Sequence, residues 1–175
     1  NIGGVSQRSF VRETSLELDK KIMDINYFGA VALTKAVLPK MIERKSGHIA
    51  TMSSLAGKFG IPLRSAYAAA KHALHGFFDT LREEVYEDNI KVTLFCPAYI
   101  KTNIAVNAIT KDGTAQNKNA PRAEKGTAPD EFAKLALKSI RKGKREVVSG
   151  GFESMGVYIK RISPRLLSKI MRKRD

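Results

Sequence analysis

Two apolar runs separated by a helical stretch constrain the fold of this chain most strongly. Residues 48–54 (HIATMSS) and 91–97 (KVTLFCP) have the length and apolar character of strands. Between them, residues 65–88 carry Ala, Leu, Phe and Glu at helical spacing, and Asn89 is a plausible stop. Strand, helix and strand in this order predict two parallel strands joined by a helical crossover.

A long helix is expected before the first strand. Thr14 and Glu17 resemble a capping box, Pro39 should bend the helix or mark its last turns, and residues 46–47 end it. Residues 1–13 have no helical pattern and are predicted to be a loop. The apolar stripe of the helix is formed by Leu18, Ile22, Ile25, Phe28, Leu33, Val37 and Met41.

The second half of the chain repeats the alternation. A polar, lysine-rich loop spans about residues 103–126, and Thr127 is the expected N-cap of a helix that runs to about Lys142. A third strand follows at residues 145–150. We therefore predict an α/β fold with a Rossmann-like, doubly wound parallel sheet covered by helices on both faces.

Composition excludes several classes of protein. The 175 residues, 43% of them apolar, can bury a sizeable core. Cys96 is the single cysteine, so no internal disulfide or multi-cysteine metal site can form. There is no run of about 18 apolar residues and no signal-peptide pattern, which predicts a cytoplasmic protein without a transmembrane helix.

The net charge of +14 is concentrated near the C-terminus. Residues 134–175 hold 13 of the 31 Lys and Arg residues but three of the 17 acidic ones. No zinc-finger spacing, basic zipper or aromatic RNA-binding motif accompanies this charge, so we expect no nucleic-acid partner. The basic segment is interpreted as a solvated surface, with contact to anionic lipid or to a partner as the alternative.

Tyr67 and Lys71 are the candidate chemical pair. They are four residues apart on the predicted helix and therefore share one face. An ammonium beside a phenol favours the phenolate, which predicts a lowered Tyr67 pKa and a usable acid or base near neutral pH. Ser54 ends the first strand, where groups point into the ligand crevice of open α/β sheets. The spacing alone also fits an ordinary surface pair.

The surrounding string resembles the central signature of the short-chain dehydrogenase/reductase family. That string is Ser-Ser-x-x-Gly, then a tyrosine 13 residues after the second serine, then Ala-Ala-Ala-Lys. The opening NIGG resembles the family's Asn-Asn-Ala-Gly loop, MDINYFG its helix asparagine, and PAYIKT at 97–102 its Pro-Gly-x-x-x-Thr turn. These motifs cover nearly all of residues 1–105 in the family's order.

The resemblance implies a role for each matched residue. Tyr67 would be the catalytic acid or base, Lys71 would lower its pKa and hold the nicotinamide ribose, and Ser54 would position the substrate oxygen. Asn26 would interrupt the helix and hold a proton-relaying water. The implied cofactor-binding residues are Asn1, Gly4, Tyr67, Lys71, Pro97, Ile100 and Thr102. The implied cofactor is NADP(H) in preference to NAD(H).

Two positions depart from the family pattern, and one motif is missing. Ile2 replaces the second asparagine of the opening loop, and Ala98 replaces a glycine, where a Cβ restricts backbone approach. The glycine-rich turn that seats the cofactor pyrophosphate is absent. We therefore expect a truncated chain holding strands five to seven of the family fold, with an exposed parallel edge beside the 48–54 strand. On its own it should bind the nicotinamide cofactor weakly.

Other side chains give weaker signals. His48, His72 and His75 lack the spacing of a metal-ligand set, so we expect no metal site. Cys96 is expected to be a small buried hydrophobe. Residues 59–61 in the loop after Ser54 could wall an apolar substrate pocket or could simply pack in the core.

Residues 152–175 form a basic, amphipathic tail behind the domain of residues 1–151. Apolar residues alternate with seven Lys or Arg residues, and a short helix is expected after Pro164. Such a helix can lie on an anionic membrane, cap the substrate pocket or pack on another subunit of a homo-oligomer.

The sequence thus predicts a nicotinamide-dependent oxidoreductase that interconverts a ketone or aldehyde and an alcohol, with an apolar, lipid- or steroid-like small molecule as substrate. The alternative is a non-catalytic scaffold of the same fold that binds a partner or an anionic membrane.

Overall fold

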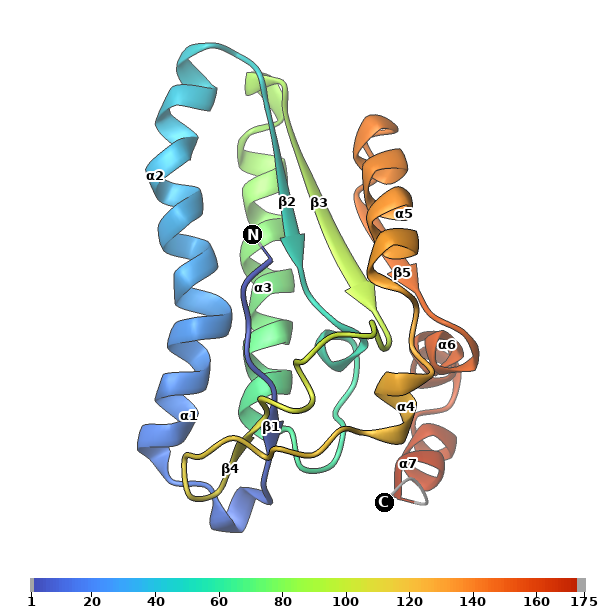
Figure 1. Ribbon diagram of the computed structural model, residues 1–175. Helices are drawn as coiled ribbons and strands as arrows, with labels where there is room; N and C mark the ends of the chain where they lie inside the picture. The colour runs from blue at the N-terminus through green and yellow to red at the C-terminus, as the bar shows by residue number, and fades with distance from the viewer. Residues whose placement is uncertain (1, 173–175) are drawn as a thin grey trace.

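The computed structural model describes residues 2–172 and contains a three-stranded parallel sheet. Its order is β2 (Gly47–Met52), β3 (Ile90–Pro97) and β5 (Glu146–Ser149), with β3 in the centre (Figure 1). Ile49 pairs with Val92 and Phe95 with Val147. The predicted α/β fold is confirmed, and β2 forms one edge of this sheet, as the sequence predicts.

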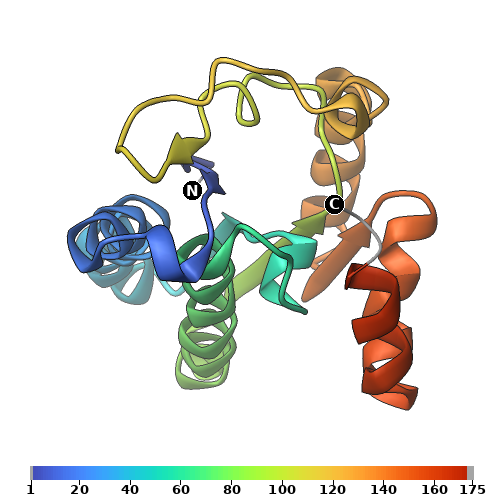
Figure 2. The ribbon, with the colours of Figure 1, turned by 90° about the horizontal axis from the view of Figure 1, so that it is seen from below.

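Helices cover both faces of the sheet (Figure 2). On one face, α3 (Ser65–Glu84) buries Leu74, Phe78 and Leu81 against the inward side chains of β2 and β3. On the other face, α5 (Pro129–Arg141) packs Phe132 against Phe95 with their ring centroids 5.9 Å apart. Because side chains alternate along a strand, each strand contributes to both apolar layers.

The long first helix is divided into two. α1 (Leu16–Met23) leads into a π-helical turn, Asp24–Phe28, and then into α2 (Gly29–Glu43), which contains Pro39 near its end. The N-cap of α1 is Ser15 and not the predicted Thr14. The Ser15 side chain accepts a hydrogen bond from the backbone nitrogen of Leu18. Ser15 has the extended backbone of an N-cap, whereas Thr14 ends a preceding 3-10 turn.

The apolar stripe of this helix is only partly buried. Leu18 and Ile22 are buried against α3, which confirms the first two positions. Further along, Ile25, Phe28, Leu33 and Val37 are between 37% and 54% exposed. Within residues 2–172 no element covers that side of the helix, so periodicity alone does not place these side chains in a core.

Residues 103–126 form a long connection between β3 and α5, outside the three-stranded sheet, as expected. Within it, β4 (Ile109–Thr110) pairs in parallel with β1 (Gln7–Arg8), and α4 (Pro121–Glu124) adds one short helical turn. The N-cap position before α5 is Ala128, one residue after the predicted Thr127, and it makes no side-chain cap. The backbone nitrogen of Thr127 instead donates to the carbonyl of Tyr99.

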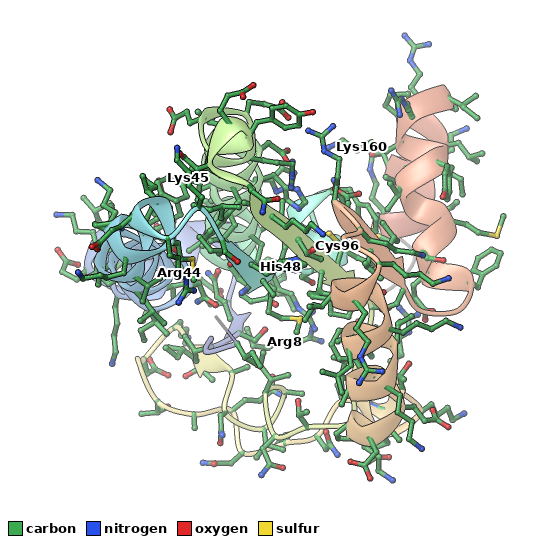
Figure 3. The ribbon with its side chains drawn as sticks, turned by 90° about the horizontal axis from the view of Figure 1, so that it is seen from above. Arg8, Arg44, Lys45, His48, Cys96 and Lys160 are labelled. Atoms are coloured by element: carbon green, nitrogen blue, oxygen red, sulfur yellow. The ribbon has the colours of Figure 1, made fainter. Side chains whose placement is uncertain are left out.

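The basic tail folds into α6 (Met155–Ile162) and α7 (Pro164–Arg172), and the second matches the predicted helix. Leu167 and Met171 of α7 are buried against Leu55 and Phe59. Lys160 of α6 donates from Nζ to the carbonyl of Lys58, 2.6 Å away (Figure 3). The tail therefore packs on its own chain. None of the helices in residues 2–172 combines the length and the apolar character needed to cross a bilayer.

Candidate active site

The candidate site forms where β2 and β3 end and α3 begins. Ser54 lies just beyond the end of β2, and Tyr67 and Lys71 point from the first turns of α3 toward the same end of the sheet. All three side chains are buried, with 8%, 6% and 3% of their surfaces exposed. Parallel strands end together at one sheet edge, so the fold gathers groups that the sequence separates.

Lys71 is held by the backbone of the strand. Its Nζ donates to the carbonyl of Met52 at 2.9 Å and lies 5.6 Å from the centre of the Tyr67 ring. Burial lowers the pKa of Lys71 to about 8, since desolvation disfavours the ammonium. At neutral pH the ammonium is still the main form.

Tyr67 does not have the lowered pKa that the sequence predicts. Burial is the largest effect and raises the pKa of its phenol above the usual value, while a hydrogen bond with Ser54 and the charge of Arg64 act in the opposite direction. Desolvation outweighs the neighbouring charges because the side chain is almost fully enclosed. The phenol therefore keeps its proton near neutral pH.

Ser54 is oriented by the backbone that follows it. Its Oγ accepts a hydrogen bond from the backbone nitrogen of Ala56 at 3.1 Å. A hydroxyl has one proton to donate and two lone pairs to accept with, so the Ser54 proton stays free to point toward Tyr67 or a bound oxygen atom.

Asn26 lies inside the π-helical turn and ties it to the opening loop. Its Nδ2 donates to the carbonyls of Val5 and Ile22, each 2.9 Å away, and its Oδ1 accepts from the nitrogen of Val5. Gly4 lies close to the same side chain. A Cβ built on Gly4 would lie 2.8 Å from Asn26 Oδ1 and 3.5 Å from Lys71 Nζ. Asn26, Gly4 and Lys71 are thus brought together, whereas Asn1 lies outside the described residues.

The other residues expected at the cofactor lie beyond the end of β3. Pro97 ends the strand, Ile100 forms a parallel bridge with Thr127, and Thr102 is exposed. Ala98, which replaces a glycine of the family pattern, packs against Gly150, where a Cβ would clash with it. Gly150 leaves room for the Cβ of Ala98, and Ala98 itself does not have a positive φ.

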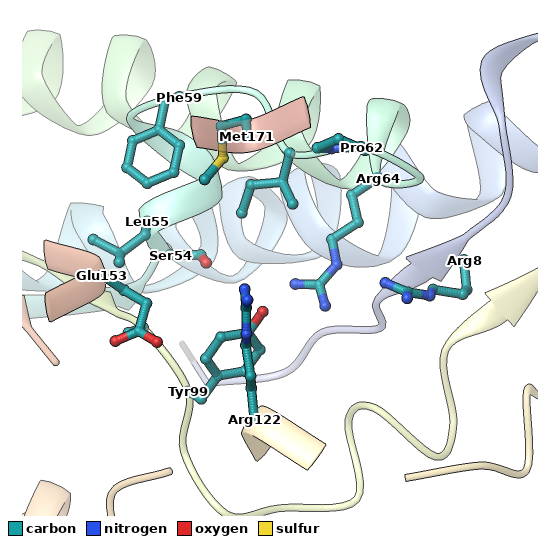
Figure 4. Close-up of a pocket in the computed structure, with 12 residues that line it drawn as sticks. Arg8, Ser54, Leu55, Phe59, Pro62, Arg64, Tyr99, Arg122, Glu153 and Met171 are labelled. Carbon is teal, nitrogen blue, oxygen red and sulfur yellow. The ribbon is translucent and has the colours of Figure 1, made fainter. Parts of the chain in front are cut away.

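A cavity of about 60 Å³ opens beside Ser54 (Figure 4). Phe59 and Ile61 line it, as the sequence suggests for residues 59–61, and Gly60 is not among its lining residues. Met171 of the tail forms another part of the wall, so the tail lies beside this cavity, which is one of the three placements that the sequence allows. Within the described part of the chain, the cavity is lined by Arg8, Ser54, Leu55, Phe59, Ile61, Pro62, Arg64, Ala98, Tyr99, Arg122, Glu153 and Met171.

Comparison with known proteins identifies the family. A family model described as short chain dehydrogenase matches residues 1–113, which is more than half of the chain. The chain belongs to the short-chain dehydrogenase/reductase family. The resemblance inferred from its motifs is therefore confirmed.

The most similar curated relatives of this short-chain dehydrogenase/reductase include two animal proteins. It is 47% identical over 175 residues to "Dehydrogenase/reductase SDR family member 7B" of Mus musculus, covering 99% of this chain and 54% of that protein. It is 45% identical over 175 residues to "Dehydrogenase/reductase SDR family protein 7-like" of Drosophila melanogaster, with the same coverage. The chain thus spans about half the length of these relatives.

Solved structures show the same fold. A short chain dehydrogenase from Burkholderia cenocepacia, in complex with NADP, has a TM-score of 0.79 at 20% identity, over 96% of this chain and 65% of that one. A short-chain dehydrogenase/reductase from Burkholderia phymatum, in complex with NAD, has a TM-score of 0.78 at 19% identity, over 94% and 65%. The Rossmann-like architecture predicted from the sequence is confirmed.

Gln7 supports the start of α3 in this short-chain dehydrogenase/reductase and was not found by sequence reasoning. Its side chain is fully buried, and its Oε1 accepts from the backbone nitrogens of Ala66 and Tyr67 at 2.9 and 3.3 Å. Its Nε2 lies 3.3 Å from Ser65 Oγ. Gln7 therefore caps a helix that begins 58 residues later, and no local pattern signals that contact.

A second polar cluster lies behind the site, around His75. Its Nε2 is 3.0 Å from Ser53 Oγ and 3.6 Å from Cys96 Sγ, while its Nδ1 is 3.6 Å from Glu146 Oε2. One ligand atom from each of His75, Cys96 and Glu146 lies within 4.8 Å of the others, and the Glu146 carboxylate also forms an ion pair with Lys58. Cys96 is fully buried as predicted, and burial raises its thiol pKa to about 12.

Proposed function

We propose that this chain carries the acid–base half of an NAD(P)-dependent oxidoreductase that interconverts a ketone or aldehyde and an alcohol. The observation that carries the proposal is the burial of Ser54, Tyr67 and Lys71 together at the carboxyl end of β2, beside a cavity. The names of the curated relatives, dehydrogenase/reductase, agree with this class of reaction.

The pKa directions suit Tyr67 as the acid in carbonyl reduction. A phenol whose pKa is raised by burial holds its proton until the carbonyl oxygen gains negative charge, and then donates that proton to form the alcohol. The Lys71 ammonium stabilises the resulting phenolate, and Ser54 donates a hydrogen bond to the same substrate oxygen. In alcohol oxidation the proton returns to Tyr67.

The residues near Lys71 fit the nicotinamide end of the cofactor. A Cβ at position 4 would displace the side chain of Asn26 beside Lys71, so glycine keeps this part of the site in place. Lys71 would hold the nicotinamide ribose, and Pro97, Ile100 and Thr102 would border the ring. The bound cofactor supplies the hydride. We propose NADP(H) rather than NAD(H) as the cofactor. The glycine turn that binds the cofactor pyrophosphate is not in these 175 residues.

The tail supports a further proposal, peripheral contact with an anionic membrane. On α6, Tyr158 and Ile162 are 65% and 86% exposed, next to the basic residues Lys160 and Arg161. Exposed apolar side chains flanked by cations suit an interface rich in anionic lipid. Flotation with phosphatidylserine vesicles should carry the protein upward in a salt-sensitive way. Equal flotation with neutral vesicles would contradict the proposal.

The decisive test of the catalytic proposal is Tyr67→Phe in the complete natural protein. Removing the phenolic oxygen removes the proton donor but little volume, so turnover of a ketone with NADPH should fall at least about 100-fold while cofactor affinity changes little. Tyr86→Phe is the matched control, because Tyr86 is 73% exposed and lies away from the site.

An unchanged kcat in Tyr67→Phe would overturn this mechanism. If the wild-type protein also failed to bind NADPH or NADH in calorimetry, the alternative of a non-catalytic scaffold would be favoured.

A further inference from the structure

The cavity beside Ser54 has one strongly basic side. Arg8 comes from β1, Arg64 from the residue before α3, and Arg122 from α4. In Figure 4 the guanidinium groups of Arg64 and Arg122 lie near Ser54 and Tyr99, and Arg8 extends toward Arg64. Three elements that are distant in sequence thus place positively charged side chains around one cavity.

These cations are not neutralised within the described chain. Among residues 2–172, no carboxylate lies within 4.0 Å of Arg8, Arg64 or Arg122, although six other ion pairs are found. Among the residues that the structure describes, Glu153 is the one acidic residue of the lining, so this part of the cavity wall carries a surplus of positive charge. The buried Nε of Arg64 also makes no hydrogen bond to any residue of 2–172.

Like charges that share a partly desolvated cavity repel one another, and a buried donor without a partner is costly. A bound anion offsets the repulsion between the three cations, because guanidinium groups bind phosphate and carboxylate through paired hydrogen bonds. Arg64 also lies over the ring of Tyr99, at 5.8 Å, which keeps the guanidinium on this side of the cavity.

Another part of the cavity wall is apolar. Leu55, Phe59, Ile61 and Met171 line it, and the first three belong to the segment that follows Ser54. A ligand that satisfies the whole lining therefore needs an anionic group and an apolar part in one molecule.

We propose that the substrate of the Ser54 and Tyr67 site carries a phosphate or carboxylate group, which Arg8, Arg64 and Arg122 bind, attached to an apolar chain. This inference rests on the proposed function and names its substrate class. It also assigns a role to Arg122, which lies in the predicted substrate loop.

Binding tests the inference without requiring turnover. Octyl phosphate, octanoate and octanol share an apolar chain and differ in their headgroups. Calorimetry on the complete natural protein, saturated with NADP⁺ to occupy the cofactor phosphate sites, should show at least one of the two anions binding at least about 10-fold more tightly than octanol. Tighter binding of octyl phosphate identifies phosphate as the preferred group, and tighter binding of octanoate identifies carboxylate.

Single substitutions then locate the anion. Arg8→Gln and Arg122→Gln should each weaken binding of the preferred anion about 10-fold and leave the affinity for octanol within about 2-fold. Arg141→Gln is the matched control, because it removes the same charge from an exposed position on α5. It should change neither affinity by more than about 2-fold.

Equal affinity for the three ligands would overturn the inference. So would an Arg141→Gln effect as large as those of Arg8→Gln and Arg122→Gln, since general electrostatic attraction would then explain the binding. Neither result bears on the catalytic role of Tyr67. Conversely, tight anion binding in a protein whose turnover survives Tyr67→Phe would keep this inference and refute the mechanism.

Discussion

Replacing Gln7 with alanine should destabilise the start of α3. The Gln7 amide is buried, accepts from the nitrogens of Ala66 and Tyr67, and has its Nε2 within 3.3 Å of three hydroxyl groups. Since an amide NH₂ has two protons, at most four of these five hydrogen bonds exist at once. Truncation removes them all and leaves the first-turn N–H groups of α3 without an acceptor.

The magnitude follows from the number of hydrogen bonds. Each contributes about 0.5–1.5 kcal/mol net, so four give about 2–6 kcal/mol, and water entering the space offsets part of the loss. We expect the free energy of unfolding to fall by about 3 kcal/mol. For a chain of this size that corresponds to a drop in Tm of roughly 6–12 °C.

Thermal unfolding followed by circular dichroism measures the effect. Gln116→Ala is the control, because its side chain makes one exposed hydrogen bond, to the carbonyl of Lys118, and should shift Tm by no more than about 2 °C. Equal melting temperatures for Gln7→Ala and Gln116→Ala would refute the claim that Gln7 supports α3.

Two further predictions concern close contacts and pH. A Cβ at Gly57 would lie 2.7 Å from the carbonyl oxygen of Lys71, whereas a Cβ at Gly60 meets nothing within 4 Å. In urea unfolding, Gly57→Ala should therefore lower the free energy of unfolding by about 1–3 kcal/mol, and Gly60→Ala should leave it nearly unchanged. Equal losses in the two variants would contradict the close packing at Gly57. Burial lowers the pKa of His75 to about 4 from 6.5, so the unfolded chain binds more protons between these values. The free energy of unfolding should rise with pH across this window and level off above it, and His75→Gln should flatten that rise.

Local patterns anticipated much of the fold and the centre of the site. The strand at 91–97 and the helix at 65–88 follow from apolar runs and helical spacing, and the structure has them at Ile90–Pro97 and Ser65–Glu84. The placement of Tyr67 and Lys71 on one helix face follows from the same period. The N-caps were each displaced by one residue, because a cap depends on local backbone angles that residue type alone does not fix.

Burial and long-range contact could not be inferred in this way. The exposure of Phe28 and Leu33 depends on which elements cover the helix, and the raised Tyr67 pKa depends on how completely the phenol is enclosed. Arg64 offered one weak signal, since it lies three residues before Tyr67 and therefore one turn away on the same side.

The sequence by itself determined the order of strands and helices and the chemistry available on α3, because both depend on residues close together in the chain. Only the tertiary structure decided that Gln7 caps α3, that Lys71 donates to Met52, and that three arginines share one cavity. Those contacts join segments from 19 to more than 50 residues apart, and they form only when the sheet brings the ends of its parallel strands to one edge.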